Sequence, residues 1–229
     1  MINMEQHPRI RDYFSQDLAD NRDITPKQRA ILQASLDLFA EKGFEQTSTS
    51  DIAQRAGVAE GTVYRRYRTK EGLRDAILAP LATNIAPMLA SDFSKDELHR
   101  RYPSLEAFLT AIYDDRVAFV LANQKEIKVI LEMVAFDQAR RNQIIGHIAP
   151  VMVQQFGGVL NQLRADQLLV PWPNDLIIQT ILSMIGGELM RGALTLPNDD
   201  PQRERTYVLG VLGKLLTPSA TDDPALTQL

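Results

Sequence analysis

Apolar residues recur at intervals of three and four positions along most of the chain, which is the spacing of an amphipathic α-helix. Strict alternation of apolar and polar residues is not found, and no Asn-Gly or Asp-Gly turn joins two apolar runs. We therefore predict an all-α protein of about nine helices. Their expected ranges are 25–43, 48–55, 59–67, 70–90, 104–122, 124–140, 142–167, 174–193 and 201–216.

Residues that favour helix ends fall between these segments. Thr25 is a good N-cap, Pro26 suits the first helical position, and Gly43 suits the end of the same helix. Pro80 and Pro87 lie inside the fourth predicted helix. Each proline removes a backbone donor and crowds the carbonyl four residues earlier, so we expect a kink or a break there.

Composition narrows the class of protein. The 229 residues are 45% hydrophobic and 24% charged, as in a soluble globular protein. The lack of cysteine excludes a disulfide framework, a thiolate zinc site and a cysteine nucleophile. No apolar run reaches about 18 residues and the N-terminus does not resemble a signal peptide, so we expect a cytoplasmic protein with no membrane partner.

Catalytic chemistry has little support in the sequence. Asp114 and Asp115 are adjacent on a predicted helix and therefore point in different directions. The three histidines form no pattern of metal ligands. We predict that the protein is not an enzyme and needs neither a metal nor another cofactor.

The segment of residues 44–73 carries the most specific pattern in the chain. Thr47 can cap a short helix whose inward residue is Ile52, and Gly57 can end that helix in a tight turn. A second short helix follows, and small residues at its start, Ala59 and Gly61, allow its backbone to approach DNA bases. This order of elements predicts a helix-turn-helix, whose second helix fits the major groove.

The same segment resembles the TetR family of bacterial transcriptional repressors. The resemblance covers about residues 25–75 and is weaker between residues 165 and 187, where the family has its dimerisation region. The matching positions are Gly43-Phe44, Thr47-Ser48, Ile52-Ala53, Ala56-Gly57-Val58, Gly61-Thr62-Val63-Tyr64, Tyr67, Thr69-Lys70-Glu71 and Leu73.

Composition and the resemblance together predict four segments in the chain, of which the two terminal ones rest on composition alone. A polar, irregular and mobile arm is expected over residues 1–23, a three-helix DNA-binding head over 24–75, and a body for effector binding and dimerisation over 76–217. Residues 218–229 are expected to be a disordered tail. The partners implied are double-stranded operator DNA, a second copy of the chain and a small-molecule effector that releases the repressor from DNA.

Ten residues of the head are the implied DNA contacts. Thr47 and Tyr64 would meet phosphates, and Lys70 would cap the backbone contact at the next helix start. Glu60 has two readings: it accepts a hydrogen bond from a cytosine amine, or it is a solvated charge that favours the helix dipole. Ala59 departs from the family, which often has a capping Ser or Asn there. The full set is Thr47, Ser48, Ala59, Glu60, Gly61, Thr62, Tyr64, Arg65, Arg66 and Lys70.

Local charge agrees with a DNA-binding head. Residues 22–75 have ten Lys or Arg and eight Asp or Glu, a net charge of +2, although the whole chain has a net charge of −4. Basic residues cluster at the end of the motif, and contacts of this kind make DNA binding depend on salt. The alternative functions are a non-enzymatic helical small-molecule-binding protein and an architectural DNA-binding protein. An architectural protein would be basic over its whole length.

Apolar and aromatic residues of the body are candidates for an effector pocket, although residues of these kinds are more often plain core. Arg116 and Glu132 have three readings: a buried ion pair, polar groups of a pocket, or exposed charges. The effector is expected to be partly apolar. The candidates are Tyr113, Arg116, Glu132, Met133, Phe136, His147, Met152, Phe156, Trp172 and Met184.

Glycines inside the last two predicted helices indicate close packing against another helix, because each costs about 1 kcal/mol relative to Ala there. We predict that these helices form the surface of a homodimer; packing only inside one protomer is the alternative. A symmetric dimer would need a near-palindromic operator. The predicted surface comprises Leu182, Gly186, Gly187, Leu189, Met190, Tyr207, Val208, Gly210, Val211, Leu212 and Leu215.

Overall fold

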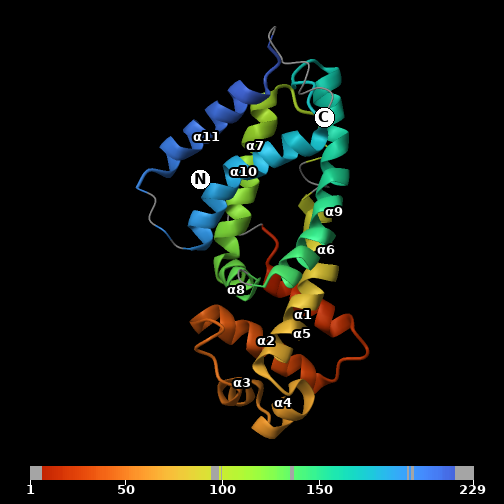
Figure 1. Cartoon of the computed structure of the whole chain (residues 1–229), viewed down its shortest axis with the longest axis vertical. Coiled ribbons are helices and arrows are strands. Elements are labelled where there is room, and N and C mark those ends of the chain that lie inside the picture. The colour runs from red at the N-terminus through yellow and green to blue at the C-terminus, as the bar shows by residue number, and fades with distance from the viewer. Residues whose placement is uncertain are drawn as a thin grey trace. The chain divides into compact units, whose positions relative to one another are not determined.

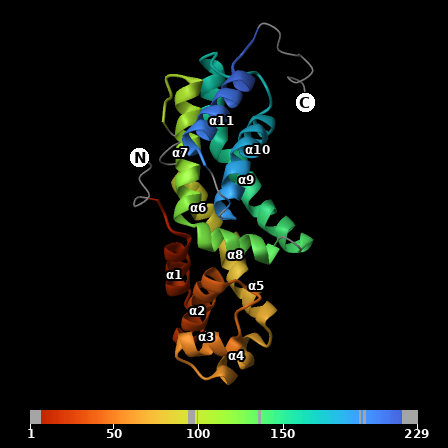
Figure 2. The same cartoon turned by 90° about the vertical axis from the view of Figure 1, so that its left-hand side faces the viewer.

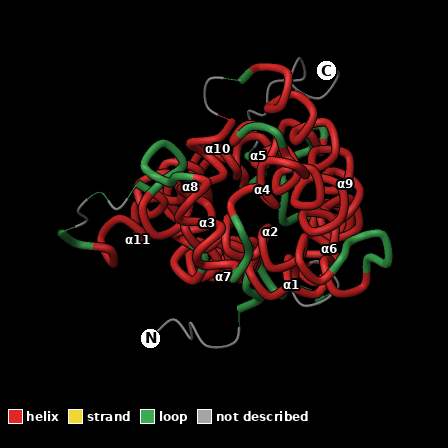
Figure 3. Tube along the Cα trace, turned by 90° about the horizontal axis from the view of Figure 1, so that it is seen from below, coloured by secondary structure: helices red, strands yellow, loops and turns green. Residues whose placement is uncertain are grey.

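The structure is a computed structural model that describes residues 7–93, 98, 100–134, 137–194, 196 and 199–219. Within these residues the chain is helical and has no strand, which confirms the predicted all-α class (Figure 3). The helices, shown in Figure 1, are α1 (Ile10–Asp20), α2 (Pro26–Lys42), α3 (Thr49–Ala56), α4 (Glu60–Tyr67), α5 (Lys70–Pro80), α6 (Ala86–Phe93), α7 (Leu105–Ala122), α8 (Gln124–Val134), α9 (Gln138–Ala165), α10 (Asn174–Ala193) and α11 (Pro201–Leu216), with a π-helical segment η2 (Leu81–Ile85) between α5 and α6.

Helix α1 corrects the prediction of an irregular segment over residues 1–23. Its apolar residues Ile10, Phe14 and Leu18 are spaced by four positions and are all buried. Three apolar residues on one face are enough for this helix, because its stability comes from burying that face against the protein and not from helix propensity. Residues 1–6 and the tail residues 220–229 lie outside the described part of the chain, so the predicted mobile arm and disordered tail stay predictions there.

The boundary between the predicted helices 124–140 and 142–167 is also wrong. Helix α8 ends at Val134, and α9 begins at Gln138 and runs through Pro150 to Ala165. Residues 135–140 contain neither Gly nor Pro, so the usual signals of a helix end are missing where α8 ends.

Of the kink or break predicted at Pro80 and Pro87, the break does not occur. Helices α5, η2 and α6 form one continuous helical stretch, Lys70–Phe93. Between the prolines the backbone widens into a π-helical turn, in which the Ala86 N–H bonds to the Leu81 carbonyl, five residues earlier. Within the described chain, this stretch is the one helix long and apolar enough to cross a membrane by length and composition. Its residues Ile77 and Ile85 are buried in the protein.

The chain divides into two compact units, and the predicted division into a DNA-binding head and an effector-binding body stays a prediction. One unit comprises Pro8–Met88 and Asn123–Ile148, so it includes α1 to α5, η2, α8 and the start of α9. The other is built mainly from Leu89–Ala122 and Ala149–Leu229. In this second unit, α7, α10 and α11 pack against one another around a single apolar cluster (Figure 2). Among its fully buried members are Phe108, Leu160, Ile177 and Leu212.

The side chain of Asn123 forms hydrogen bonds with the backbone at the start of α1, within the first unit. Its side chain is fully buried at 0% exposure. The Oδ1 atom accepts a hydrogen bond from the Ile10 N–H at 2.7 Å, and Nδ2 donates to the Pro8 carbonyl at 3.1 Å. Because Asn123 immediately precedes α8, these two bonds tie the start of α1 to the start of α8.

Replacement of Asn123 by Ala should therefore destabilise the protein. The substitution leaves the Ile10 N–H and the Pro8 carbonyl without this partner, and a buried polar group without a hydrogen bond costs about 1–3 kcal/mol. Urea unfolding followed by circular dichroism measures this loss. Asn142→Ala, at an exposed position of α9, is the matched control and should change the free energy of unfolding by less than about 0.5 kcal/mol. Equal stabilities of the two variants would contradict the role assigned to Asn123.

Candidate nucleic-acid interface

Three short-range features build α2, the first helix of the head. The Thr25 hydroxyl accepts a hydrogen bond from the Gln28 N–H, and the Gln28 side chain accepts one from the Thr25 N–H, which is a reciprocal capping box. Pro26 occupies the first turn, and the chain leaves the helix at Gly43 with φ +88°. The predicted start and end of this helix are confirmed.

Helices α3 and α4 pack against each other with a tight turn between them. Gly57 ends α3 in the left-handed conformation at φ +66°, and the Val58 N–H bonds to the Ala53 carbonyl. Helix α3 buries Ile52 and Ala53, and α4 buries Val63, so both helices are fixed on their inner sides. This arrangement is a helix-turn-helix, as predicted.

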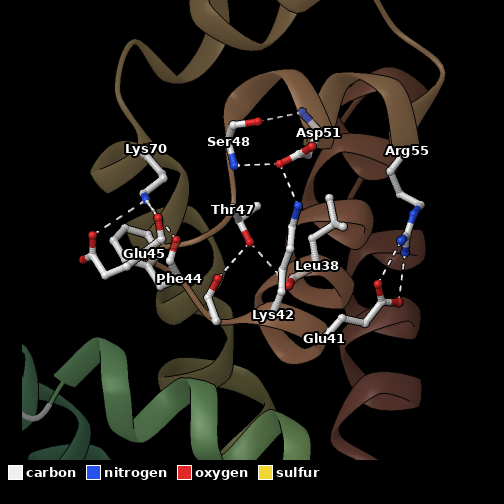
Figure 4. A network of polar contacts seen from close by, with 11 residues as sticks. Leu38, Glu41, Lys42, Phe44, Glu45, Thr47, Ser48, Asp51, Arg55 and Lys70 are labelled. Atoms are coloured by element: carbon white, nitrogen blue, oxygen red, sulfur yellow. Dashed lines mark hydrogen bonds and ion pairs between the residues drawn. The ribbon is translucent and has the colours of Figure 1, made fainter.

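The start of α3 differs from the prediction. Ser48, not Thr47, is the N-cap: its hydroxyl accepts from the Asp51 N–H at 3.1 Å, and the Asp51 carboxylate accepts from the Ser48 N–H at 3.0 Å (Figure 4). Thr47 is only 2% exposed, and its hydroxyl donates to the Gly43 carbonyl at 2.8 Å. Its hydroxyl therefore holds the α2–α3 loop together, which argues against the direct phosphate contact implied for it.

Lys70 braces the same loop from the other side. Its Nζ atom donates to the carbonyls of Phe44 at 2.9 Å and Glu45 at 3.2 Å, and it lies 4.4 Å from the centre of the Phe44 ring (Figure 4). Within the protein Lys70 therefore contacts the preceding loop, and its implied role in a contact with the DNA backbone stays a prediction. Gly72 is required nearby, since a Cβ atom there would lie 2.5 Å from the Tyr67 carbonyl oxygen.

Asp51 links α3 to the end of α2. Its Oδ2 atom is 2.7 Å from Lys42 Nζ and also accepts from the Ser48 backbone (Figure 4). The hydrogen bond from Lys42, followed by those from Ser48, holds the pKa of the Asp51 carboxyl well below its usual range. The carboxylate is therefore the form that the folded head prefers.

The stabilisation by Asp51 should disappear in acid. Because its pKa is lower in the folded state than in the unfolded chain, its contribution is complete above the unfolded value, near pH 4, and falls as the pH drops further. We expect Asp51→Asn to be less stable than the parent at pH 7, with the difference shrinking between about pH 4 and pH 2. Urea unfolding at a series of pH values measures it; a difference that does not change with pH would contradict this assignment.

The outer side of α4 is open to solvent and carries most of the implied DNA contacts. Glu60, Gly61, Arg65 and Arg66 are exposed, and Tyr64 is 50% exposed. Thr62 is half-buried. Ala59 occupies the N-cap position of α4 without a side-chain hydrogen bond, so the predicted absence of a cap is confirmed.

Thr49 is a residue of this surface that the sequence reasoning missed. It is the first residue of α3, and its hydroxyl lies within hydrogen-bonding distance of both Glu60 and Tyr64 on α4. The spacing of Glu60 and Tyr64, four residues apart on a helix, was the available signal that one residue of α3 could contact both.

The candidate effector residues divide into core residues and residues at the surface. Tyr113 and Phe156 are buried in the apolar cluster of the second unit, and Met152, Trp172 and Met184 pack against it. These placements fit the plain-core alternative as well as a pocket lining. The side chains of Met133 and His147, and Phe136 as a whole, lie outside the described residues.

The buried ion pair considered for Arg116 and Glu132 is contradicted, because Glu132 is exposed. Arg116 instead pairs with the neighbouring Asp115, and its guanidinium carbon lies 3.8 Å from the centre of the Phe93 ring. Of the three readings, exposure is therefore the one that holds for Glu132, whereas Arg116 has an ion-pair partner one residue away.

Some residues of the predicted dimer surface are exposed and others are buried, and the dimer itself stays a prediction. Val208 and Leu212 are buried in the protomer's own apolar cluster, which lies where α11 packs against α7 and α10. Gly186 and Val211 are half-buried, and the side chain of Leu189 lies outside the described residues. The other predicted residues are exposed, namely Leu182, Gly187, Met190, Tyr207, Gly210 and Leu215.

The glycines of this surface are not explained by packing within the protomer. A Cβ atom built on Gly186, Gly187, Gly210 or Gly213 meets no atom within 4 Å. Tyr207 is 69% exposed on the same helix as Gly210. A groove of about 810 Å³ runs between α7 and α11 and is lined in part by Gly210 and Gly213.

The fold and this surface define a helix-turn-helix protein whose second unit is also helical. Residues 31–77 match the family profile described as bacterial regulatory proteins, tetR family. An HTH-type transcriptional repressor from Mycobacterium tuberculosis is 45% identical over 71 residues, which are 31% of this chain and 38% of the relative. The chain spans about two fifths of the length of the curated relatives it matches most strongly.

Solved structures extend the likeness beyond the head. A protein from Mesorhizobium loti, described as a TetR-family transcriptional regulator, superposes with a TM-score of 0.63 at 16% identity, covering 84% of this chain and 97% of the other. The regulator FadR from Bacillus subtilis, solved with stearoyl-CoA, has a TM-score of 0.57 at 19% identity, covering 82% and 96%. At these identities the likeness concerns the fold. The tetR family profile thus matches the helix-turn-helix region of this chain, and the fold of the chain is similar to that of solved TetR-family regulators.

Proposed function

We propose that the protein is a sequence-specific DNA-binding transcriptional regulator that acts as a repressor. The observation that carries the proposal is the exposed side of α4, where Tyr64, Arg65 and Arg66 project from a helix fixed on its inner side. A helix of this size enters the major groove, and arginine pairs with guanine edges and phosphates there. The repressor role is supported by the name of the Mycobacterium tuberculosis relative.

Selection of bound sequences from random duplex DNA tests this proposal. We expect enrichment of a near-palindrome at about 150 mM salt, with half-sites separated by about 34–36 Å or a multiple of that distance. Enrichment of no sequence would overturn it. The experiment also supplies an operator for the binding measurements that follow.

The partner on DNA is proposed to be a second copy of the chain. Support comes from exposed apolar residues on α10 and α11, including Leu182, Met190 and Tyr207, beside glycines whose missing side chains serve no packing in the protomer. An apolar surface of this kind favours association through burial of its area. We place the protein in the cytoplasm, where an operator is accessible.

A small molecule is proposed to release the regulator from DNA. The second unit offers the setting, since Tyr113, Phe156 and Met184 belong to or pack against one apolar cluster enclosed by helices. The Bacillus subtilis regulator of similar fold was solved with stearoyl-CoA, so an acyl-CoA is a reasonable first probe. Stearoyl-CoA added to the complex with selected DNA should lower the fraction bound if this class of ligand is correct. By linkage, such a ligand must bind the free form more tightly than the DNA-bound form.

A further inference from the structure

A polar triangle joins the two helices of the helix-turn-helix at its exposed edge. Thr49 Oγ1 on α3 lies 3.1 Å from Glu60 Oε1 and 3.0 Å from Tyr64 Oη on α4. Glu60 and Tyr64 lie one turn apart on the same side of α4. The Thr49 hydroxyl therefore sits between a carboxylate and a phenol.

The number of protons in the triangle fixes the direction of its hydrogen bonds. Thr49 has a single hydroxyl proton, and the Glu60 carboxylate can only accept. Both contacts are satisfied together when the Tyr64 hydroxyl donates to Thr49 Oγ1 and the Thr49 hydroxyl donates to Glu60 Oε1. Glu60 is then held by one oxygen, and its second oxygen keeps its acceptor positions at the exposed start of α4.

A hydrogen-bond acceptor at the start of α4, such as the second oxygen of Glu60, would favour some bases over others in the major groove. In the major groove, cytosine presents an amine donor, whereas guanine presents two acceptors and thymine presents an acceptor and a methyl group. Adenine offers an amine beside an acceptor nitrogen, which repels a carboxylate. A carboxylate also repels phosphates, so Glu60 adds discrimination rather than general affinity.

From this geometry we propose that Glu60 is a specificity-determining residue that reads the amine of a cytosine in each operator half-site, and that Thr49 is the positioning residue that orients its carboxylate. The inference rests on the proposed function, because it assumes that α4 enters the major groove. A charge that only favours the helix dipole would contribute to stability and would not depend on the base opposite it.

Parallel selections from random duplex DNA with the full chain and three variants test this proposal. The parent should select cytosine at one position of each half-site, with a preference of about 5- to 150-fold. Glu60→Gln should shift that position toward adenine, because a Gln amide pairs with adenine. Thr49→Val removes the hydroxyl at nearly constant shape and should weaken the preference at this position several-fold, leaving the other positions unchanged. Thr49→Ser, which restores a hydroxyl, should restore it.

Glu71→Gln provides the matched control, since it removes the same charge from an exposed position of α5 and should alter no position of the selected site. Melting followed by circular dichroism establishes that each variant is folded. Identical selected sites for the parent and Glu60→Gln would overturn the inference and leave the proposed function standing. A Glu60-dependent position that is not cytosine in the parent site would also overturn it. Failure of every protein to enrich any sequence would instead overturn the proposed function.

Discussion

Substitution of both Arg65 and Arg66 by alanine is expected to weaken binding to the selected operator at least about a hundredfold at about 150 mM salt. Each arginine that contacts a base edge contributes about 1–3 kcal/mol of discrimination, and each that neutralises a phosphate adds to the salt-dependent part of the affinity. Both side chains are exposed on α4, so their removal leaves the core of the head intact. Fluorescence anisotropy with a labelled operator duplex measures the affinity and its dependence on salt.

Lys125→Ala combined with Lys128→Ala provides the matched control for this pair. Both lysines are exposed on α8, and the double variant loses the same two positive charges outside the helix-turn-helix. We expect it to bind the operator within a few-fold of the parent, with an almost unchanged salt slope. If both double variants lost affinity equally, net charge rather than the surface of α4 would determine binding.

Leucine at both Gly187 and Gly210 should separate folding of the protomer from assembly of the dimer. Within the protomer both positions are exposed and a Cβ atom at either meets no neighbour, so removal of two helical glycines should leave the fold intact or stabilise it by roughly 0.5–1 kcal/mol each. In a dimer packed through these glycines, the added side chains would enter a close-packed surface at a cost of typically about 1–3 kcal/mol each. Because a dimer contains four such sites, we expect the dimer dissociation constant of the variant to be at least about a hundredfold larger than that of the parent.

Analytical ultracentrifugation measures the association, and circular dichroism melting measures the fold. Leucine at Gly146 and Gly158 is the control, because both glycines are exposed on α9 and likewise have no atom near a built Cβ. That variant should associate like the parent. A Gly187 and Gly210 variant that remains a dimer would place the interface elsewhere on the protein.

The parts of the head that could be predicted are those that depend on residues close together in the sequence. The capping box at Thr25 and Gln28, the proline at the first turn and the left-handed glycine at Gly57 each act within four residues. For that reason the helix-turn-helix and its boundaries could be predicted to within one or two residues. Val63 is the buried residue of α4, so the residues on the opposite side of this short helix are exposed.

Features that depend on distant packing could not be predicted. Helix α1 has a weak apolar stripe, and its buried position also depends on Asn123, more than 100 residues away. Val208 and Leu212 are buried in a cluster formed with residues of other helices, and a helical period alone does not identify those packing partners. The internal role of Thr47 follows from the path of the α2–α3 loop, and the adjacent hydroxyls of Thr47 and Ser48 are both of a kind that can cap a helix.

The central claim is that two copies of this chain read a specific duplex through α4. The most direct measurement is a titration of three duplexes with the protein at about 150 mM salt, with the stoichiometry determined in parallel. The duplexes are the selected operator, the operator with one half-site scrambled, and the operator with both half-sites scrambled. We predict two protomers per operator and an affinity at least about a thousandfold above that for fully scrambled DNA, with an intermediate value for the duplex with one intact half-site. Equal affinities for all three duplexes would contradict sequence-specific recognition by this protein.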